Sequence, residues 1–154
     1  MRLFVRCLSL MGVALLAGCG GLRQGLAEEG YLQQQLYDYS YAVPLDSLWA
    51  EAKAVTGASG GAEGTEGGVR TLSVSARQGD AQAPGSLGLH LRGWEADGRA
   101  YLHIFRVRHG DPMPQPADLS ARAADLEMRL LERFHPEDAR RFQEGAHRAG
   151  ARAR

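Results

Sequence analysis

The strongest constraint on the fold of this chain is a pair of alternating segments on either side of Asp97 and Gly98. An Asp-Gly dipeptide between alternating segments is typical of a two-residue β-hairpin turn. Leucines occupy every second position over 87–91, and Leu102 and Ile104 continue the alternation after the turn. A hairpin places these aliphatic side chains on one face, and a two-residue slip of the register preserves that face. The opposite face then carries His90, Arg92, Trp94, Tyr101, His103 and Phe105.

Two earlier segments alternate in the same way. Tyr37, Tyr39, Tyr41 and Val43 would share one face of a strand. Over 69–76, aliphatic side chains alternate with threonine and serine. We therefore predict four strands, of which the last three form an antiparallel meander.

Three segments have the apolar spacing of amphipathic helices. Over 45–55 the apolar residues recur every three or four positions, with Pro44 at the start and Gly57 at the end. Similar stripes run over 119–134 and 139–146. The order is strand, helix, three-strand meander and two helices. It predicts an α+β fold: a four-stranded antiparallel sheet whose aliphatic face is covered by the C-terminal helices.

Residues 57–68 contain six glycines together with Glu63 and Glu66. A phosphate-binding loop needs a lysine and a hydroxyl at fixed positions after its glycines. This segment lacks that pattern, and its charges are negative. We therefore predict a flexible surface loop here.

The first 18 residues have the pattern of a targeting segment. Arg2 and Arg6 precede an apolar run that is much shorter than the roughly 20 residues a membrane-spanning helix needs. A short apolar run behind a basic start is typical of a secretory signal peptide. We expect residues 1–18 to be removed, leaving a chain of the length of one domain.

The end of this run resembles the lipobox of bacterial lipoproteins: Leu16, Ala17, Gly18 and Cys19. The resemblance implies that the Cys19 thiol receives a diacylglycerol and that the chain is cut before Cys19. Acyl chains at that position give stable membrane anchoring. Gly20 stands where an aspartate would favour the inner membrane, which implies an outer-membrane lipoprotein facing the periplasm. The alternative is an ordinary signal peptide followed by a chance cysteine.

Composition divides the remaining chain into three parts. Residues 19–35, rich in glycine and glutamine, are predicted to be a lipidated tether, and 36–149 a single α+β domain. Residues 150–154 form an arginine-rich tail, for which we weigh contact with anionic lipid against a solvated helix end. The whole chain has 18 basic and 18 acidic residues, which argues against nucleic acid as the main partner.

The sequence contains few candidates for chemistry. His90 and His103 lie on one predicted face, but zinc takes three or four protein ligands and no further ligand joins them. Ser73 and Ser75 lie in a strand without the turn of a nucleophile elbow. We therefore expect no enzyme activity, no bound metal and no cofactor.

The face of six residues opposite the leucines is the candidate binding surface. Arginine, tryptophan and tyrosine are the residue types that most often anchor protein interfaces. The alternative is that the C-terminal helix or the tether covers this face. We expect a non-catalytic binding or scaffold module whose partner is another envelope protein. A periplasmic carrier of a small ligand or lipid, with a pocket between sheet and helix, is the alternative.

Two stretches resemble small, uncharacterised bacterial lipoproteins. Residues 41–49 resemble their opening, where a strand runs through Val43, Pro44 and Leu45 into a helix with Trp49. Residues 125–139 resemble their C-terminal signature. The element order is also similar to the helix-grip domains of a lipoprotein in the outer-membrane β-barrel assembly machine. This resemblance implies a helix-grip-like fold and, apart from Cys19, assigns no functional residue.

Overall fold

The computed structural model describes residues 21–58, 60–75, 87–108, 110–115 and 117–154. The predicted signal peptide and the lipobox with Cys19 lie outside the described residues. Within the described part, the chain folds into a four-stranded antiparallel sheet with helices packed on it, so the predicted α+β class is confirmed.

The four strands follow one another in space in the order in which they occur along the chain. They are β1 (Ala62–Glu66), β2 (Val69–Val74), β3 (Leu87–Ala96) and β4 (Arg99–Arg108). The helices are α2 (Leu45–Thr56), α3 (Ala124–Phe134) and α4 (Pro136–Arg152), and η1 (Leu119–Ala121) is a single 3₁₀ turn. Residues 21–36 form a further helix, which we call the N-terminal helix.

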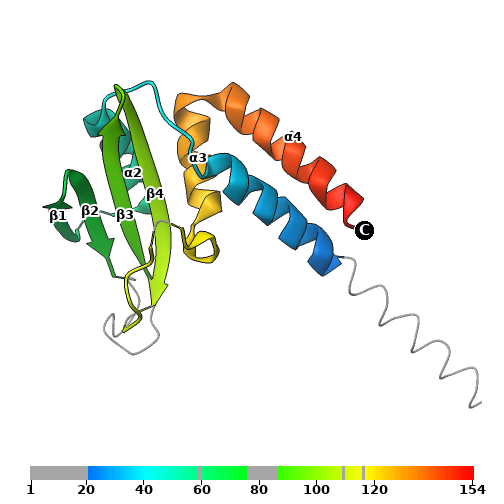
Figure 1. Cartoon of the computed structure of the whole chain (residues 1–154), viewed down its shortest axis with the longest axis horizontal. Coiled ribbons are helices and arrows are strands. Elements are labelled where there is room, and N and C mark those ends of the chain that lie inside the picture. Colours follow the sequence, from blue (N-terminus) through cyan, green and yellow to red (C-terminus); the bar gives the residue numbers. More distant parts are fainter. Residues whose placement is uncertain (1–20, 59, 76–86, 109, 116) are drawn as a thin grey trace, which may run out of the picture.

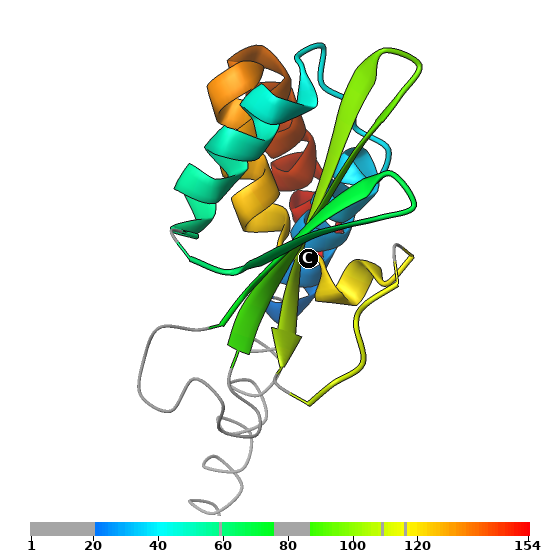
Figure 2. The ribbon, with the colours of Figure 1, turned by 90° about the vertical axis from the view of Figure 1, so that its left-hand side faces the viewer.

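The helices form two layers behind the sheet. α2 contacts β3 and β4, α3 contacts β4, and α4 packs on α3 (Figure 1, Figure 2). The N-terminal helix lies along α4 in the opposite direction, with Tyr31 beside Gly145 and Glu28 beside Gly150. The sheet and the free end of this helix pair therefore occupy opposite ends of the molecule.

The predicted hairpin is confirmed. Asp97 and Gly98 both have positive φ, 52° and 71°, as a tight two-residue turn between twisted strands requires. Leu91 pairs with Ile104, and Gly93 pairs with Leu102, so these residues share the face toward the helices. At Gly93 an added Cβ would lie 3.1 Å from the Trp49 ring, which shows how closely α2 approaches the sheet.

The predicted helix over 45–55 is α2, and its apolar stripe is buried. Leu48, Trp49, Ala52 and Val55 all face the core, and Gly57 ends the helix in the left-handed conformation. Trp49 is thus a core anchor under the sheet.

The predicted loop over 57–68 is wrong in its central part, because β1 and the turn to β2 lie there. Every residue of β1 is exposed, so its pairing with β2 rests on backbone hydrogen bonds. No hydrophobic periodicity could reveal such a strand. The signal that was present is the pair Gly67 and Gly68, which take φ of 56° and 82° in the turn.

The tyrosine segment 37–43 is not the first strand of the sheet. Tyr41 makes a single antiparallel bridge with Ala100, at the free edge of β4. The tyrosines do not share a face: the Tyr37 ring lies 6.5 Å from His103, whereas Tyr39 and Tyr41 pack with residues of α3 and α4. The segment connects the N-terminal helix to α2 and meets β4 only at this bridge. The alternating pattern of its side chains therefore does not correspond to a ladder of backbone hydrogen bonds.

Most of the predicted tether is helical, because residues 21–36 form the N-terminal helix. The Gly25 and Gly30 positions face open space, where each glycine costs about 1 kcal/mol relative to alanine in a helix. Packing compensates for this cost, because Gly145 and Gly150 of α4 let the helix approach closely: a Cβ at Gly145 would overlap the Tyr31 phenol. Tertiary contact therefore overrides the low local propensity.

The C-terminal helices differ from the prediction at their ends. α3 begins at Ala124 rather than at the start of the predicted stripe over 119–134, because Arg122 is extended and forms a bridge with Phe105 of β4. α4 contains the predicted stripe over 139–146, but it begins earlier, at Pro136, and continues to Arg152. Most of the predicted arginine-rich tail is therefore the last turn of a helix.

A buried ion pair joins these parts. Arg122 and Glu127 side chains are 1% and 3% exposed, and the Arg122 Nε donates to Glu127 Oε1 at 2.7 Å. The same carboxylate accepts the Ile104 backbone N–H of β4 at 2.8 Å, and Arg122 Nη2 also donates to the Leu36 carbonyl. Burial raises the pKa of Glu127, while the Arg122 guanidinium and the Ile104 N–H oppose that rise.

We predict that Arg122→Met lowers the free energy of unfolding by about 3–5 kcal/mol, because it leaves the Glu127 carboxylate buried without its charged partner. Chemical denaturation measures this change. The double variant Arg122→Met/Glu127→Met should recover a large part of the loss, since it removes both charges. A single variant as stable as the natural chain would contradict the role assigned to the pair.

Candidate binding face

The six residues predicted to share the sheet face opposite the leucines do so. The register pairs Trp94 with Tyr101, Arg92 with His103, and His90 with Phe105. Cα partners in antiparallel strands point to the same side, so the hairpin delivers all six side chains to one surface. α2 and α3 pack against the other face.

Part of this face is covered. Phe105 is fully buried, and His103 and His90 are 6% and 8% exposed. The Arg122 guanidinium carbon lies 6.0 Å from the centre of the Phe105 ring, and the Tyr37 carbonyl lies 3.1 Å from His103 Nε2. This part of the face is therefore covered by Tyr37, which follows the N-terminal helix, and by Arg122, which precedes α3, and not by the C-terminal helix or the tether that the alternative named.

His103 is held neutral by this environment. Because its Nε2 faces a carbonyl oxygen, that nitrogen carries the hydrogen and donates it to Tyr37. The Nδ1 atom is buried and has no hydrogen-bond partner among the described residues. Burial, together with the nearby charge of Arg122, lowers the pKa of His103 to about 4.

His90 has a different partner. Its Nδ1 lies 3.0 Å from the Ser73 hydroxyl of β2, and burial, with the charge of Arg92, lowers its pKa. The two histidines stand diagonally across β3 and β4, since His90 pairs with Phe105 and not with His103. Within the described residues, no group of three or more His, Cys, Asp or Glu side chains is placed to hold a metal ion.

The accessible part of the face is a stacked aromatic pair. The Trp94 and Tyr101 rings lie 5.3 Å apart and nearly parallel, at 6°, and both side chains are half-buried. The edge of His103 supports the Trp94 ring at 4.9 Å and 88°. Half-buried Arg92 lies beside the pair on the same strand as Trp94. We call Arg92, Trp94 and Tyr101 the aromatic patch.

This arrangement is suited to binding rather than to reaction chemistry. Its rings are held in place by packing, so little of their side-chain freedom would be lost on contact, and the Arg92 guanidinium supplies hydrogen-bond donors on the same face. Tyr37 and Arg122 also contact this face, and the sequence pattern predicted neither contact. Both lie outside regular strands, where no periodicity indicates the direction of a side chain.

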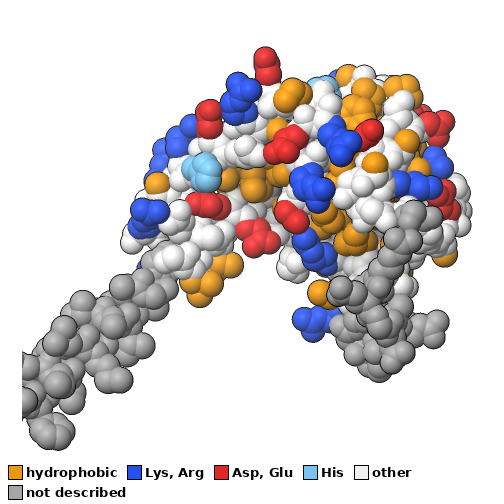
Figure 3. All heavy atoms as spheres, turned by 180° about the vertical axis from the view of Figure 1, so that it is seen from behind, with side chains coloured by type: hydrophobic (Ala, Val, Ile, Leu, Met, Phe, Trp, Pro, Cys, Tyr) orange, Lys and Arg blue, Asp and Glu red, His pale blue; other side chains and the backbone are white. Residues whose placement is uncertain are grey.

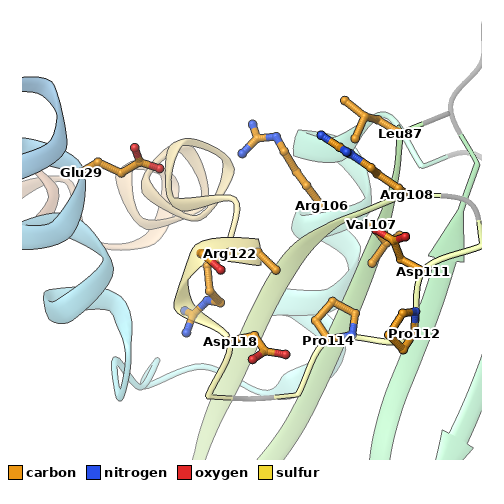
Figure 4. Close-up of a pocket in the computed structure, with 12 residues that line it drawn as sticks. Glu29, Leu87, Arg106, Val107, Arg108, Asp111, Pro112, Pro114, Asp118 and Arg122 are labelled. Atoms are coloured by element: carbon orange, nitrogen blue, oxygen red, sulfur yellow. The ribbon is translucent and has the colours of Figure 1, made fainter. Parts of the chain in front are cut away.

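A separate pocket of about 490 Å³ opens beside the end of β4 (Figure 4). Glu29 of the N-terminal helix, Arg106 and Arg108 of β4, and Asp118 lie around it, together with proline residues of the connection to η1. Its lining carries acids and arginines in equal number, and Arg106 is already paired with Asp125 at 2.7 Å. The pocket lies at the rim of the sheet, and not between the sheet and α2.

In the described part of the chain, no helix is both long enough and apolar enough to cross a membrane.

We predict that the free energy of unfolding falls as the pH drops from about 6.5 to about 4, because His103 takes up a proton in the unfolded chain but stays neutral in the folded one. Lowering the pKa of His103 to about 4 corresponds to a loss of about 3 kcal/mol in the free energy of unfolding over this pH range. Denaturant unfolding at a series of pH values measures it.

The matched variants for this experiment are His103→Gln and His147→Gln. Glutamine at 103 can still donate to the Tyr37 carbonyl but does not titrate, so much of the pH dependence should disappear. His147 is exposed on α4, and its replacement should leave the dependence intact. A His103→Gln variant with an unchanged pH profile would show that His103 is not the responsible group.

No protein-family model matches the chain, and neither the curated proteins nor the solved structures contain a significant match.

Proposed function

We propose that this chain is a membrane-anchored bacterial lipoprotein that acts as a non-catalytic binding or scaffold module in the cell envelope. In this proposal Cys19 carries the acyl chains, and the domain faces the periplasm from the outer membrane. The partner is another envelope protein, bound through the aromatic patch.

The observation that carries the binding half of the proposal is the rigid stack of Trp94 on Tyr101. The rings are half-buried, so they are supported from below and still present area to a partner. Neighbouring Thr71 of β2 pairs with Arg92 and extends the same face with a small polar side chain. Aromatic anchors surrounded by smaller polar groups are the usual composition of an interface centre and its rim.

The carrier alternative has less support from the structure. A ligand or lipid pocket is usually lined by apolar side chains with few polar groups. The pocket beside the end of β4 instead contains six charged residues: Glu29, Arg106, Arg108, Asp111, Asp118 and Arg122.

Anchoring through Cys19 predicts that Cys19→Ala releases the protein from membranes. The variant cannot receive the acyl chains, each buried methylene of which contributes about 0.8 kcal/mol to membrane binding. Cell fractionation, together with metabolic labelling by a fatty-acid analogue, measures both losses. Membrane retention of the unlabelled variant would contradict the anchoring proposal.

Binding through the aromatic patch predicts site-specific crosslinking in intact cells. A photo-reactive amino acid at Thr71 should yield a discrete adduct, and adding Trp94→Ala should remove that adduct. The matched control is the same photo-reactive residue at Ala50, which is exposed on α2. Equal adducts from both positions, or an adduct from Thr71 that survives Trp94→Ala, would count against this surface as the binding site.

A further inference from the structure

The N-terminal helix presents apolar side chains to solvent at its first turns. Leu22 and Leu26 are 69% and 61% exposed. Gln24, Glu28 and Tyr31 lie on the side that contacts α4. Since residues four apart share a helix face, Leu22 and Leu26 point together, away from α4. Nothing in the packing of the domain therefore accounts for these two leucines.

Arginines surround the same end of the molecule. Because the two helices are antiparallel, the last turn of α4 lies beside the first turns of the N-terminal helix, and Arg154 Nε donates to Gln24 Oε1 at 2.8 Å. Arg152, Arg148 and Arg23 are exposed nearby. Figure 3 shows basic and hydrophobic side chains near the end where the described chain begins, with acidic side chains beside them.

We propose that this leucine–arginine end, formed by Leu22, Arg23, Leu26, Arg148, Arg152 and Arg154, rests on the surface of a phospholipid bilayer. The leucines insert at the boundary between headgroups and acyl chains, and the arginines bind anionic headgroups. The inference rests on the proposed function, because acylation of Cys19 is what brings this end to a bilayer.

Chain length makes the bilayer the fitting occupant. Leu22 is three residues after Cys19, so even a fully extended chain separates their Cα atoms by no more than about 11 Å. An interfacial helix buries its apolar side about 5–10 Å into the boundary region, with basic residues along its edges. Acylated Cys19 would hold these side chains close to the bilayer. A partner protein at this end would therefore have to compete with lipid for them.

This contact also sets the orientation of the domain. The N-terminal helix spans about 24 Å over its 16 described residues, and the sheet lies at the far end of the molecule (Figure 1). The predicted tether therefore acts as a stiff spacer, which holds the aromatic patch away from the bilayer.

Site-directed spin labelling of the full lipidated protein tests the contact. Under the proposed processing, Cys7 is removed with the signal peptide and Cys19 is acylated. An added cysteine is then the one free thiol of the processed protein. Nitroxides at Leu22→Cys and Leu26→Cys are compared with Gln34→Cys, an exposed position at the other end of the same helix. The protein is placed in vesicles of phosphatidylethanolamine with phosphatidylglycerol, and collision rates are measured with oxygen and with a water-soluble nickel chelate.

We expect the ratio of oxygen to nickel accessibility to be several-fold higher at Leu22→Cys and Leu26→Cys than at Gln34→Cys. Replacing both arginines by glutamate, Arg152→Glu and Arg154→Glu, should lower that ratio in these vesicles and have little effect in pure phosphatidylcholine vesicles.

Membrane-bound protein with all three labels accessible to nickel would overturn the proposed bilayer contact but leave the anchoring through Cys19 intact. Labels shielded from both reagents, or broadened by a neighbouring label, would assign the surface to a protein or a second copy. Failure of the unlabelled protein with Cys19 to bind vesicles at all would refute the proposed function instead.

Discussion

The buried pair of Arg122 and Glu127 is the interaction on which the arrangement of the other elements depends. The two charges are withdrawn from water, so they must be paired with each other. Glu127 accepts from α3 both the guanidinium and the Ile104 N–H of β4. Arg122 Nη2 also donates to the Leu36 carbonyl at the end of the N-terminal helix, while Arg122 Nη1 has no partner among the described residues. One pair therefore fixes the position of a helix from each half of the chain against one strand.

The pair also explains why half of the candidate binding face is closed. Arg122 must be extended to reach Glu127, and an extended Arg122 bridges to Phe105 and lies over its ring. With Tyr37 beside it, His103 is enclosed and held neutral. What is left to solvent is the outer part, where Trp94 stacks on Tyr101. The boundary between the structural and the accessible half of this surface is thus set by a charge pair in the core.

The sequence predicted the parts of the fold in which apolar periodicity and turn chemistry agree. The hairpin at Asp97 and Gly98 placed six side chains on the correct face, and α2 and α4 began close to the expected positions. It failed where backbone pairing or tertiary contact decides, as in the wholly exposed strand β1 and in the N-terminal helix with its unfavourable glycines. The extent of burial across the binding face was beyond prediction for the same reason, since the covering residues come from irregular segments.

The way β4 is closed has a consequence for assembly. Its outer edge is occupied at Ala100 by Tyr41 and at Ile104 by the Glu127 carboxylate and the Ala123 N–H. The other edge strand of the described sheet, β1, is short and carries glutamates. The two edges are thus protected against pairing with a second copy by different means: β4 by bonds to its own chain, and β1 by its length and charge. The sheet discourages edge-to-edge association on both sides without a covering strand on either.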